Sequence, residues 1–450
     1  MKKLTLSLLL LLAYILPCTS CSSKSNIDRN NIYSGFSEYE IIPQENSGPL
    51  YLGGYSIGSE IEGVLDYQKV KAVYLNYYGE ELLMLSIDCV GLSSSYVNQI
   101  RKGIGVSFNI NIASTHTHAG LDTIGLWGPI ANDGKNSAFM DSLVKQSIKA
   151  GKEAIEKQKQ GKLTFGQVTT ENVIRDSRAP YIYDENMYQL RFVPNDLSAA
   201  TRMIFFSAHA EALGGSNKQL SADFPGYMSK LIKDQSNDNT IYFNGAIGGL
   251  IMTKTFDEND IVNNMKLTGE ILANYALSIE EKEVEKGALK QIKIKYDIEL
   301  DNTIFKYYGF LGILKTKCYK NIFTGKYYMK SETSVLQISN LTFVLIPGEI
   351  FPELVYGGSR INEESNKENP PTILELANNY GIDKLIIIGL CNDEIGYIVP
   401  PSDFLINEKY PYIQDRPDSS GENHYEETNS VGIDSSYALY KALEKAFSKI

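Results

Sequence analysis

Short apolar segments alternate with longer amphipathic segments along most of this chain, and this alternation narrows the possible folds more than any other feature. The short segments are rich in branched and aromatic residues, which is typical of buried strands. They are residues 71–78, 82–88, 110–115, 203–208, 241–243 and 384–390. The longer segments repeat apolar residues at helical spacing, and they are residues 93–104, 136–158, 225–235, 265–281 and 435–448. Strands that alternate with helices predict an α/β fold with a mixed sheet core and flanking helices.

The pattern changes in the second half of the chain, where the strand-like runs 292–300 and 334–346 are longer. Two polar segments, 119–134 and 400–422, are predicted to be loops. The first of them contains the only tryptophan, Trp127. Loops that carry polar and aromatic residues often line binding sites, so both loops are expected to lie near the functional site.

The N-terminus has the features of an exported lipoprotein. A basic start precedes an apolar run over residues 4–16, which has the length of a signal peptide and is too short to span a bilayer. Residues 1–20 are therefore predicted to be a lipoprotein signal peptide. Cys21 is the predicted lipidated residue, since a small residue precedes it, whereas Pro17 makes Cys18 a poorer choice. An ordinary secretory signal with incidental cysteines is the alternative.

Two further segments follow from this interpretation. Residues 21–45 are predicted to be a lipid-anchored linker, in which the polar stretch 22–31 lifts the domain off the membrane. Residues 46–450 are predicted to form the catalytic domain. The expected location is the cell envelope, with the protein lipid-anchored in the periplasm or at the cell surface.

The charge of the chain excludes some classes of partner. The chain has 43 Lys and Arg against 54 Asp and Glu, a formal net charge of -11, and loss of the signal peptide makes this more negative. An acidic body argues against nucleic acid and against an anionic membrane surface as main partner. Beyond Cys21 only Cys89, Cys318 and Cys391 remain. Their odd number and wide spacing predict buried apolar residues and no disulfide framework.

Histidine is scarce, with four in the chain, and three of them follow predicted strands. His116 and His118 lie where a strand opens into a loop, and residues two apart in extended backbone point to the same side. His209 directly follows the strand-like run 203–208. Binding sites in α/β folds lie beyond the carboxyl ends of strands. The three histidines therefore predict a metal site there, or a metal ligand paired with an acid–base group.

Glu349 is the carboxylate best placed to join these histidines. It follows a Pro-Gly turn after a predicted strand and leads into a predicted helix. Taken alone, it would cap that helix, whose N-terminus favours negative charge. Beside three histidines, it is a candidate oxygen ligand for zinc. The segment 392–397, which follows another apolar strand, is on its own an ordinary polar loop.

A competing motif is G-x-S-x-G at residues 54–58, which would make Ser56 a serine-hydrolase nucleophile. That motif needs a strand before it and a helix after it, and neither is predicted here. The chain contains no H-E-x-x-H helix, no P-loop and no G-x-G-x-x-G fingerprint. The motifs therefore favour a metal site over a serine nucleophile.

Four segments in this order resemble the catalytic domain of the neutral/alkaline non-lysosomal ceramidase family. They are STHTHAG at 114–120, ADFPGY at 222–227, IPGE at 346–349 and HYEETNS at 424–430. The first two are the more specific, and the resemblance covers most of residues 50–432. It implies one zinc ion bound by two histidines, a glutamate and a tyrosine. These would be His116, His209, Glu349 and Tyr397.

The same resemblance implies three catalytic residues. His118 would lie in the second shell of the metal or touch the substrate. Tyr425 resembles the tyrosine that donates a hydrogen bond to the developing oxyanion. Arg178 resembles an active-site arginine, and a surface or salt-bridged arginine is the alternative.

The chain departs from the family pattern in two respects. Gly248 stands where the family has a serine that is proposed as nucleophile or substrate contact. There is also no counterpart of the C-terminal immunoglobulin-like domain. The expected function is a zinc-dependent, ceramidase-like hydrolase that cleaves the amide (N-acyl) bond of a small amphipathic or lipid substrate through metal-activated water. A zinc-dependent esterase or lactonase, and a non-catalytic surface lipoprotein that binds a lipid or glycan, are the alternatives.

Overall fold

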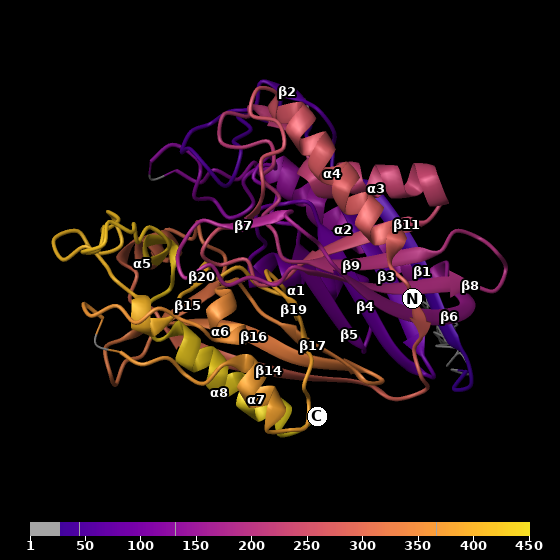
Figure 1. Ribbon diagram of the computed structural model, residues 1–450. Helices are drawn as coiled ribbons and strands as arrows, with labels where there is room; N and C mark the ends of the chain where they lie inside the picture. Colours follow the sequence, from indigo (N-terminus) through magenta and orange to yellow (C-terminus); the bar gives the residue numbers. More distant parts are fainter. Residues whose placement is uncertain (1–27, 45, 131, 366) are drawn as a thin grey trace, which may run out of the picture.

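The computed structural model describes residues 28–450 except residues 45, 131 and 366. Two mixed sheets pack face to face, and helices cover their outer faces (Figure 1). The larger sheet contains β1 (Ile32–Glu40), β3 (Lys69–Tyr77), β4 (Glu80–Ile87), β5 (Asn109–Ser114), β6 (Lys159–Thr169), β8 (Asn186–Pro194), β9 (Thr201–Phe206), β11 (Asn239–Asn244) and β13 (Lys282–Glu283). Their order is β11-β9-β8-β6-β1-β3-β4-β5, and β13 pairs with β6. The β9–β11 and β4–β5 pairs are parallel, and the other pairs are antiparallel.

The smaller sheet has five strands, and three further strand pairs lie outside both sheets. Its strands are β14 (Leu289–Glu299), β15 (Lys317–Lys320), β16 (Tyr327–Ile338), β17 (Leu341–Leu345) and β19 (Ile386–Ile388). Their order is β14-β16-β17-β19, with β15 beside β16. The pairs are β2 (Gly63–Val64) with β10 (Gln219–Leu220), β7 (Ile174–Asp176) with β12 (Ile251–Thr253), and β18 (Glu349–Ile350) with β20 (Tyr397–Ile398).

The main core lies between the two sheets. Phe205 of β9 packs on Phe243 of β11 and on Phe343 of β17, with ring centroids 5.3 and 5.2 Å apart. Leu75 and Leu345 belong to the same buried cluster. Because strands of both sheets contribute to this cluster, its burial fixes how one sheet sits on the other.

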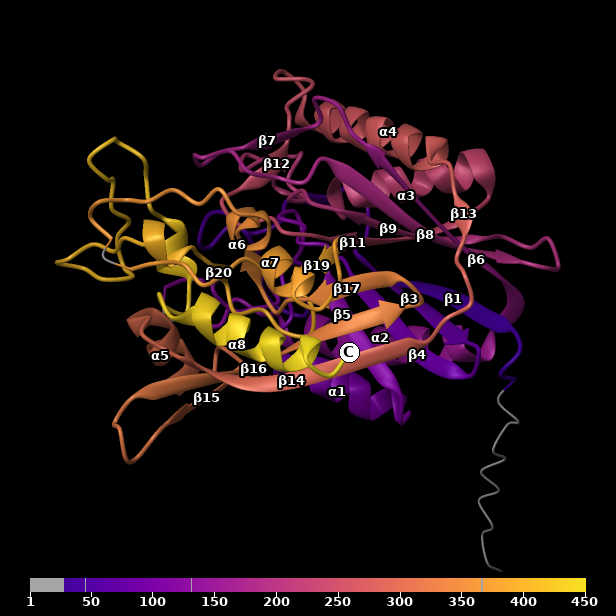
Figure 2. The ribbon, with the colours of Figure 1, turned by 60° about the horizontal axis from the view of Figure 1, so that its bottom comes forward.

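The helices cover the two outer faces, as Figure 2 shows from a second direction. Those on the larger sheet are α1 (Ser94–Ile104), α2 (Ser137–Glu156), α3 (Asp223–Ser236) and α4 (Ile261–Ser278). Those packed with the smaller sheet are α6 (Pro352–Tyr356), α7 (Ile373–Asn378) and α8 (Ser435–Phe447). The short α5 (Thr303–Phe310) lies beside β15, and two 3-10 turns, η1 (Pro401–Asp403) and η2 (Glu426–Asn429), complete the list. The Asn136 side chain caps α2 by accepting a hydrogen bond from the Phe139 backbone N–H.

The predicted α/β class, with a mixed sheet core and flanking helices, is confirmed, although the core consists of two sheets. One boundary was wrong: β1 lies inside the predicted linker 21–45 and pairs with both β3 and β6. The run 334–346 is also not one strand, because it reverses at Ser339, whose φ is +56°. The predicted signal peptide and Cys21 lie outside the described residues.

The cysteines can be compared with the expectation from the sequence. Cys89 and Cys391 are free and buried, whereas Cys318 is free and half-buried. Among the described residues, no helix is both long and apolar enough to cross a bilayer.

Candidate metal centre

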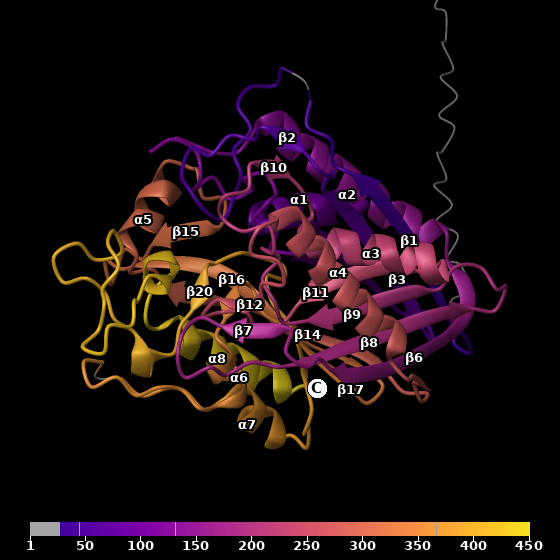
Figure 3. The same cartoon turned by 45° about the horizontal axis from the view of Figure 1, so that its top comes forward.

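The carboxyl ends of three strands deliver the residues of the site. His116 follows β5, His209 follows β9, and Glu349 begins β18 four residues after β17 ends. Figure 3 shows strands of the larger sheet, among them β9 and β11, running side by side. The two sheets therefore both contribute to the site, which lies at the strand ends where the sequence placed it.

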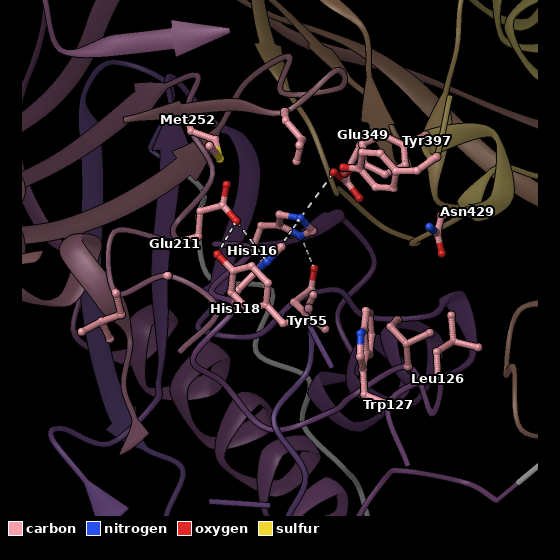
Figure 4. Close-up of a pocket in the computed structure, with 18 of the residues that line it drawn as sticks. Tyr55, His116, His118, Leu126, Trp127, Glu211, Met252, Glu349, Tyr397 and Asn429 are labelled. Atoms are coloured by element: carbon pink, nitrogen blue, oxygen red, sulfur yellow. Dashed lines mark hydrogen bonds and ion pairs between the residues drawn. The ribbon is translucent and has the colours of Figure 1, made fainter. Parts of the chain in front are cut away.

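Four side chains form the histidine–glutamate cluster, which consists of His116, His118, His209 and Glu349. His209 Nε2 lies 3.0 Å from Glu349 Oε2, and His116 Nε2 lies 3.4 Å from the same oxygen. The Nε2 atoms of His116 and His118 are 3.0 Å apart. One ligand atom from each histidine lies within 4.8 Å of the others, and all four residues are buried. Figure 4 shows His116, His118 and Glu349 of this cluster.

Backbone carbonyls fix the ring orientation of two of these histidines. His209 Nδ1 lies 2.9 Å from the Ile251 carbonyl oxygen, and His116 Nδ1 contacts the Val90 carbonyl oxygen. A carbonyl only accepts, so each Nδ1 carries a proton and each ring turns its Nε2 towards Glu349. At 3.0 Å from a carboxylate oxygen, Nε2 of His209 needs a proton or a cation between the two atoms, and Glu349 accordingly raises the pKa of His209 against the effect of burial. Two imidazoles and a carboxylate are a donor set that suits zinc.

The charges within the cluster shift its titration. Burial alone would raise the pKa of Glu349, but His116 and His209 hold it well below the ordinary value. Burial, together with the charges of His116 and His209, lowers the pKa of His118 well below the ordinary value. Glu349 is thus an anion and His118 a neutral ring at pH 7, as metal ligands and their neighbours must be.

Two tyrosines lie next to the cluster. Glu349 and Tyr397 are register partners in the parallel β18–β20 pair, so their side chains leave the pair on the same side. The Tyr397 hydroxyl lies 3.1 Å from the Tyr425 hydroxyl. Burial and then the charge of Glu349 raise the pKa of Tyr397 well above the ordinary value. The structure thus brings Tyr397 and Tyr425, both predicted from the sequence, to the same cavity as His116 and His118.

The residues that hold His118 were not predicted from the sequence. Glu211 Oε2 lies 3.3 Å from His118 Nδ1 and accepts a hydrogen bond of 2.7 Å from the Tyr55 hydroxyl. A Cβ atom on Gly54, whose φ is +113°, would lie 2.4 Å from His118 Cγ, so only glycine lets this loop approach the ring. Glu211 follows His209 by two residues, and this spacing was the signal that could have revealed it.

Ser56 lies in an exposed loop without flanking strand or helix. The G-x-S-x-G motif therefore does not form a nucleophile elbow in this structure.

A cavity of about 820 Å³ opens onto the cluster. Apolar and acidic side chains both line it; they include Ile57, Val90, Ile124, Leu126, Trp127, Leu213, Leu250, Met252, Phe305, Leu314, Met329, Glu211 and Glu394. The Asp122 carboxylate accepts backbone hydrogen bonds from Ile124, Gly125 and Trp127 and so shapes the loop that carries Trp127. The expectation that the loop 119–134 lines the site is confirmed.

Arg178 is not among the described residues that line this cavity. It is buried and pairs with Asp403 at 3.0 Å, Glu426 at 2.9 Å and Glu427 at 3.1 Å. Its guanidinium also lies 5.2 Å from the centre of the Phe351 ring. The salt-bridged alternative therefore describes Arg178, which holds the segment after Tyr425 against the segment after Glu349.

Gly248 has no room for a side chain. A Cβ atom there would lie 2.6 Å from the backbone nitrogen and the ring of Phe351. The Gly248 N–H donates a 2.9 Å hydrogen bond to the Ile350 carbonyl. Glycine at this position thus allows the segment that carries Glu349 to approach closely, and no hydroxyl reaches the cluster from here.

No family model and no curated protein matches the chain. Two ceramidases are among the solved structures that are similar to it. A neutral ceramidase from Pseudomonas aeruginosa superposes with a TM-score of 0.68 at 15% identity, over 93% of this chain and 75% of that chain. A ceramidase complexed with C2 superposes with a TM-score of 0.69 at 14% identity, over the same shares. The chain therefore has the fold of these ceramidases, as the resemblance of its sequence segments implied.

Proposed function

We propose that this protein is a zinc-dependent hydrolase that cleaves the amide (N-acyl) bond of an amphipathic, lipid-like substrate. The observation that carries this proposal is the convergence of His116 Nε2 and His209 Nε2 on Glu349 Oε2, where His116 and Glu349 line an 820 Å³ cavity and His209 lies buried behind them. The ceramidase fold of the chain supports the reaction class. The apolar lining of the cavity supports a substrate with a hydrocarbon portion.

A zinc ion would be held by His116, His209 and Glu349, with Tyr397 as the fourth ligand implied by the resemblance, and would supply a polarised carbonyl and a water of lowered pKa. Tyr425, whose hydroxyl lies 3.1 Å from that of Tyr397, is placed to donate a hydrogen bond to the developing oxyanion. Neutral His118 presents Nε2 to the cluster and can accept or return a proton there.

The rest of the cavity holds the substrate. Tyr55 and Glu211 orient His118 from one side. Leu126 and Trp127 contribute apolar surface on the loop shaped by Asp122, and this surface would contact an acyl chain and exclude water. Together these side chains would bind the substrate in a fixed orientation before the chemical step.

An esterase or lactonase activity is the second candidate, and the packing at Gly248 favours it. Esters and lactones have better leaving groups than amides, so they need less help from a side-chain nucleophile. A matched pair of substrates that differ only in an amide or ester linkage separates the two activities. Glu349→Gln is the control, because it removes the anionic ligand. The proposal predicts amide hydrolysis that Glu349→Gln abolishes; ester hydrolysis alone would select the second candidate.

A protein that binds its ligand without turnover is the remaining alternative. It would retain a lipid or glycan tightly, and neither linkage would be cleaved above the rate of the Glu349→Gln variant. The proposed setting is the cell envelope, with the chain anchored through a lipid on Cys21. Mass spectrometry of the N-terminal peptide after expression with the intact signal tests this: a diacylglyceryl cysteine at Cys21 is expected, and an unmodified Cys21 would contradict it.

A further inference from the structure

Residues 303–330 expose a concentration of large apolar side chains. Phe310 is 88% exposed and Leu311 follows it at the end of α5. Ile322 and Phe323, 84% and 91% exposed, lie in the turn between β15 and β16. Exposed apolar residues that occur singly need no explanation, but a group of this kind marks a surface that meets another apolar phase.

The elements that carry these side chains lie next to one another. Lys306 Nζ of α5 lies 5.7 Å from the ring centre of Tyr327 in β16, and Lys320 Nζ of β15 lies 5.4 Å from the same ring. Figure 2 shows α5 beside β15, with the β15–β16 turn projecting from the body of the molecule. α5 and the β15–β16 hairpin are therefore neighbours, and both carry exposed apolar side chains.

The charge of this segment is opposite to that of the whole chain. Residues 303–330 contain six lysines and no acidic residue, within a chain of net charge -11. Lys326 and Lys330 pair with Glu299 and Asp297 of β14. The remaining lysines include exposed Lys315, Lys317 and Lys320, which form no ion pair with the part of the chain that the structure describes. Lysines next to exposed aromatic and aliphatic side chains are typical of surfaces that bind anionic lipid head groups.

The inner side of the same segment forms a wall of the cavity. Phe305, Leu314, Thr316 and Met329 all line the 820 Å³ space that reaches the histidine–glutamate cluster. The segment thus has exposed apolar and basic side chains outside and substrate-facing side chains inside. A lipid at a membrane surface would meet the outer side chains first and the cavity wall next.

We propose that residues 303–330 form a docking surface for an anionic lipid bilayer, from which the substrate enters the cavity. The role in substrate entry rests on the proposed function, whereas membrane binding itself does not. Charge complementarity favours the bilayer as the occupant, and the projecting turn allows Phe323 to reach between head groups. The net charge of -11, which argued against an anionic membrane partner, is a sum over the whole chain. That sum conceals the basic character of residues 303–330.

The test is co-sedimentation with vesicles of phosphatidylcholine alone or mixed with phosphatidylglycerol. The chain starting at Ser22 is used, because it lacks the predicted lipidation site and keeps every described residue. One double variant, Phe310→Ser/Phe323→Ser, removes apolar contacts; another, Lys317→Glu/Lys320→Glu, reverses charge. The matched control is Leu197→Ser, a 95% exposed leucine in the turn between β8 and β9.

We expect the parent chain to bind the anionic vesicles, and to bind them more weakly as salt rises. Each double variant should weaken this binding about tenfold or more, and Leu197→Ser should leave it unchanged. Absence of binding by the parent chain, or equal binding by the parent and both double variants, would overturn the proposal. Equal losses in Leu197→Ser would show non-specific adsorption and would also overturn it.

A second assay separates this inference from the proposed function. The double variants should hydrolyse a water-soluble short-chain substrate at the parent rate and lose activity only on vesicle-borne substrate. A parent chain that binds vesicles but hydrolyses neither substrate would contradict the proposed function and leave the docking surface intact. Loss of activity on both substrates in the Phe310→Ser/Phe323→Ser variant would place these residues in the active site and contradict docking.

Discussion

His209 Nε2 lies 3.0 Å from Glu349 Oε2, although the two residues are 140 positions apart in the chain. His209 follows β9 of the larger sheet, whereas Glu349 follows β17 of the smaller sheet. A cation bound between them would therefore link the two sheets, and its binding free energy would add to the stability of the fold. The site and the packing of the sheets depend on each other.

Tyr425→Phe should lower kcat and leave metal content unchanged. The variant removes the hydroxyl that lies 3.1 Å from Tyr397 while keeping the ring. Loss of one oxyanion donor costs about 10²–10³ in kcat. Steady-state kinetics with elemental analysis measures both quantities, and Tyr181→Phe, at an exposed tyrosine, serves as control. A Tyr425→Phe enzyme within twofold of the parent would remove this residue from the mechanism.

Arg178→Met should destabilise the protein without a direct effect on the chemistry. The variant leaves Asp403, Glu426 and Glu427 buried without their cation. Removal of one partner from such a buried group costs about 3–5 kcal/mol. Urea unfolding measures the cost, and Arg175→Met, at an exposed arginine, is the matched control. Unchanged stability together with lost activity would return Arg178 to the active site.

Glu353→Gln should change how stability depends on pH. Burial, together with the neighbouring charge of Asp176, raises the pKa of Glu353 to about 8, although Arg178 opposes the shift. The folded state therefore binds a proton that the unfolded state releases near pH 4.5, so this contribution is complete below that pH and is lost as pH rises through 8. The parent should lose on the order of 4 kcal/mol between pH 5 and 9 through this group, most of it between pH 5 and 8. Thermal unfolding across that range should show a flatter profile for Glu353→Gln, and parallel profiles would contradict the assignment.

Gly248→Ser should fail to create a serine nucleophile. Its Cβ would collide with the backbone of Phe351, two residues after Glu349. The variant is expected to lose about 1–3 kcal/mol of stability and to bind metal more weakly. Unfolding and metal titration test this. Increased amide hydrolysis with unchanged metal affinity would contradict the account of this position.

Local patterns in the sequence predicted much of the site. His116, His118 and His209 were found because they are scarce and follow apolar strands, and alternating strands and helices indicated the α/β class. Tyr397 and Tyr425 came only from the resemblance, since an isolated tyrosine carries no local signal. Their proximity depends on the β18–β20 pairing and on the turn at η2.

Other features depend on contacts between distant segments, which periodicity cannot reveal. The partners of Arg178 lie more than 200 positions away, so nothing beside it in the sequence distinguished an ion pair from an active-site role. β1 was assigned to a linker because its neighbours β3 and β6 are supplied by later parts of the chain. Two facing sheets, in place of one, likewise follow from packing and not from local pattern.

The measurement that tests the central claim most directly is the zinc content of the chain starting at Ser22 and of its His209→Ala variant. Elemental analysis gives the metal content, and circular dichroism verifies that the variant is folded. The account predicts one zinc ion per parent chain and its loss from folded His209→Ala protein. Zinc retained by His209→Ala, or no metal in either protein, would contradict a metal site built on His116, His209 and Glu349.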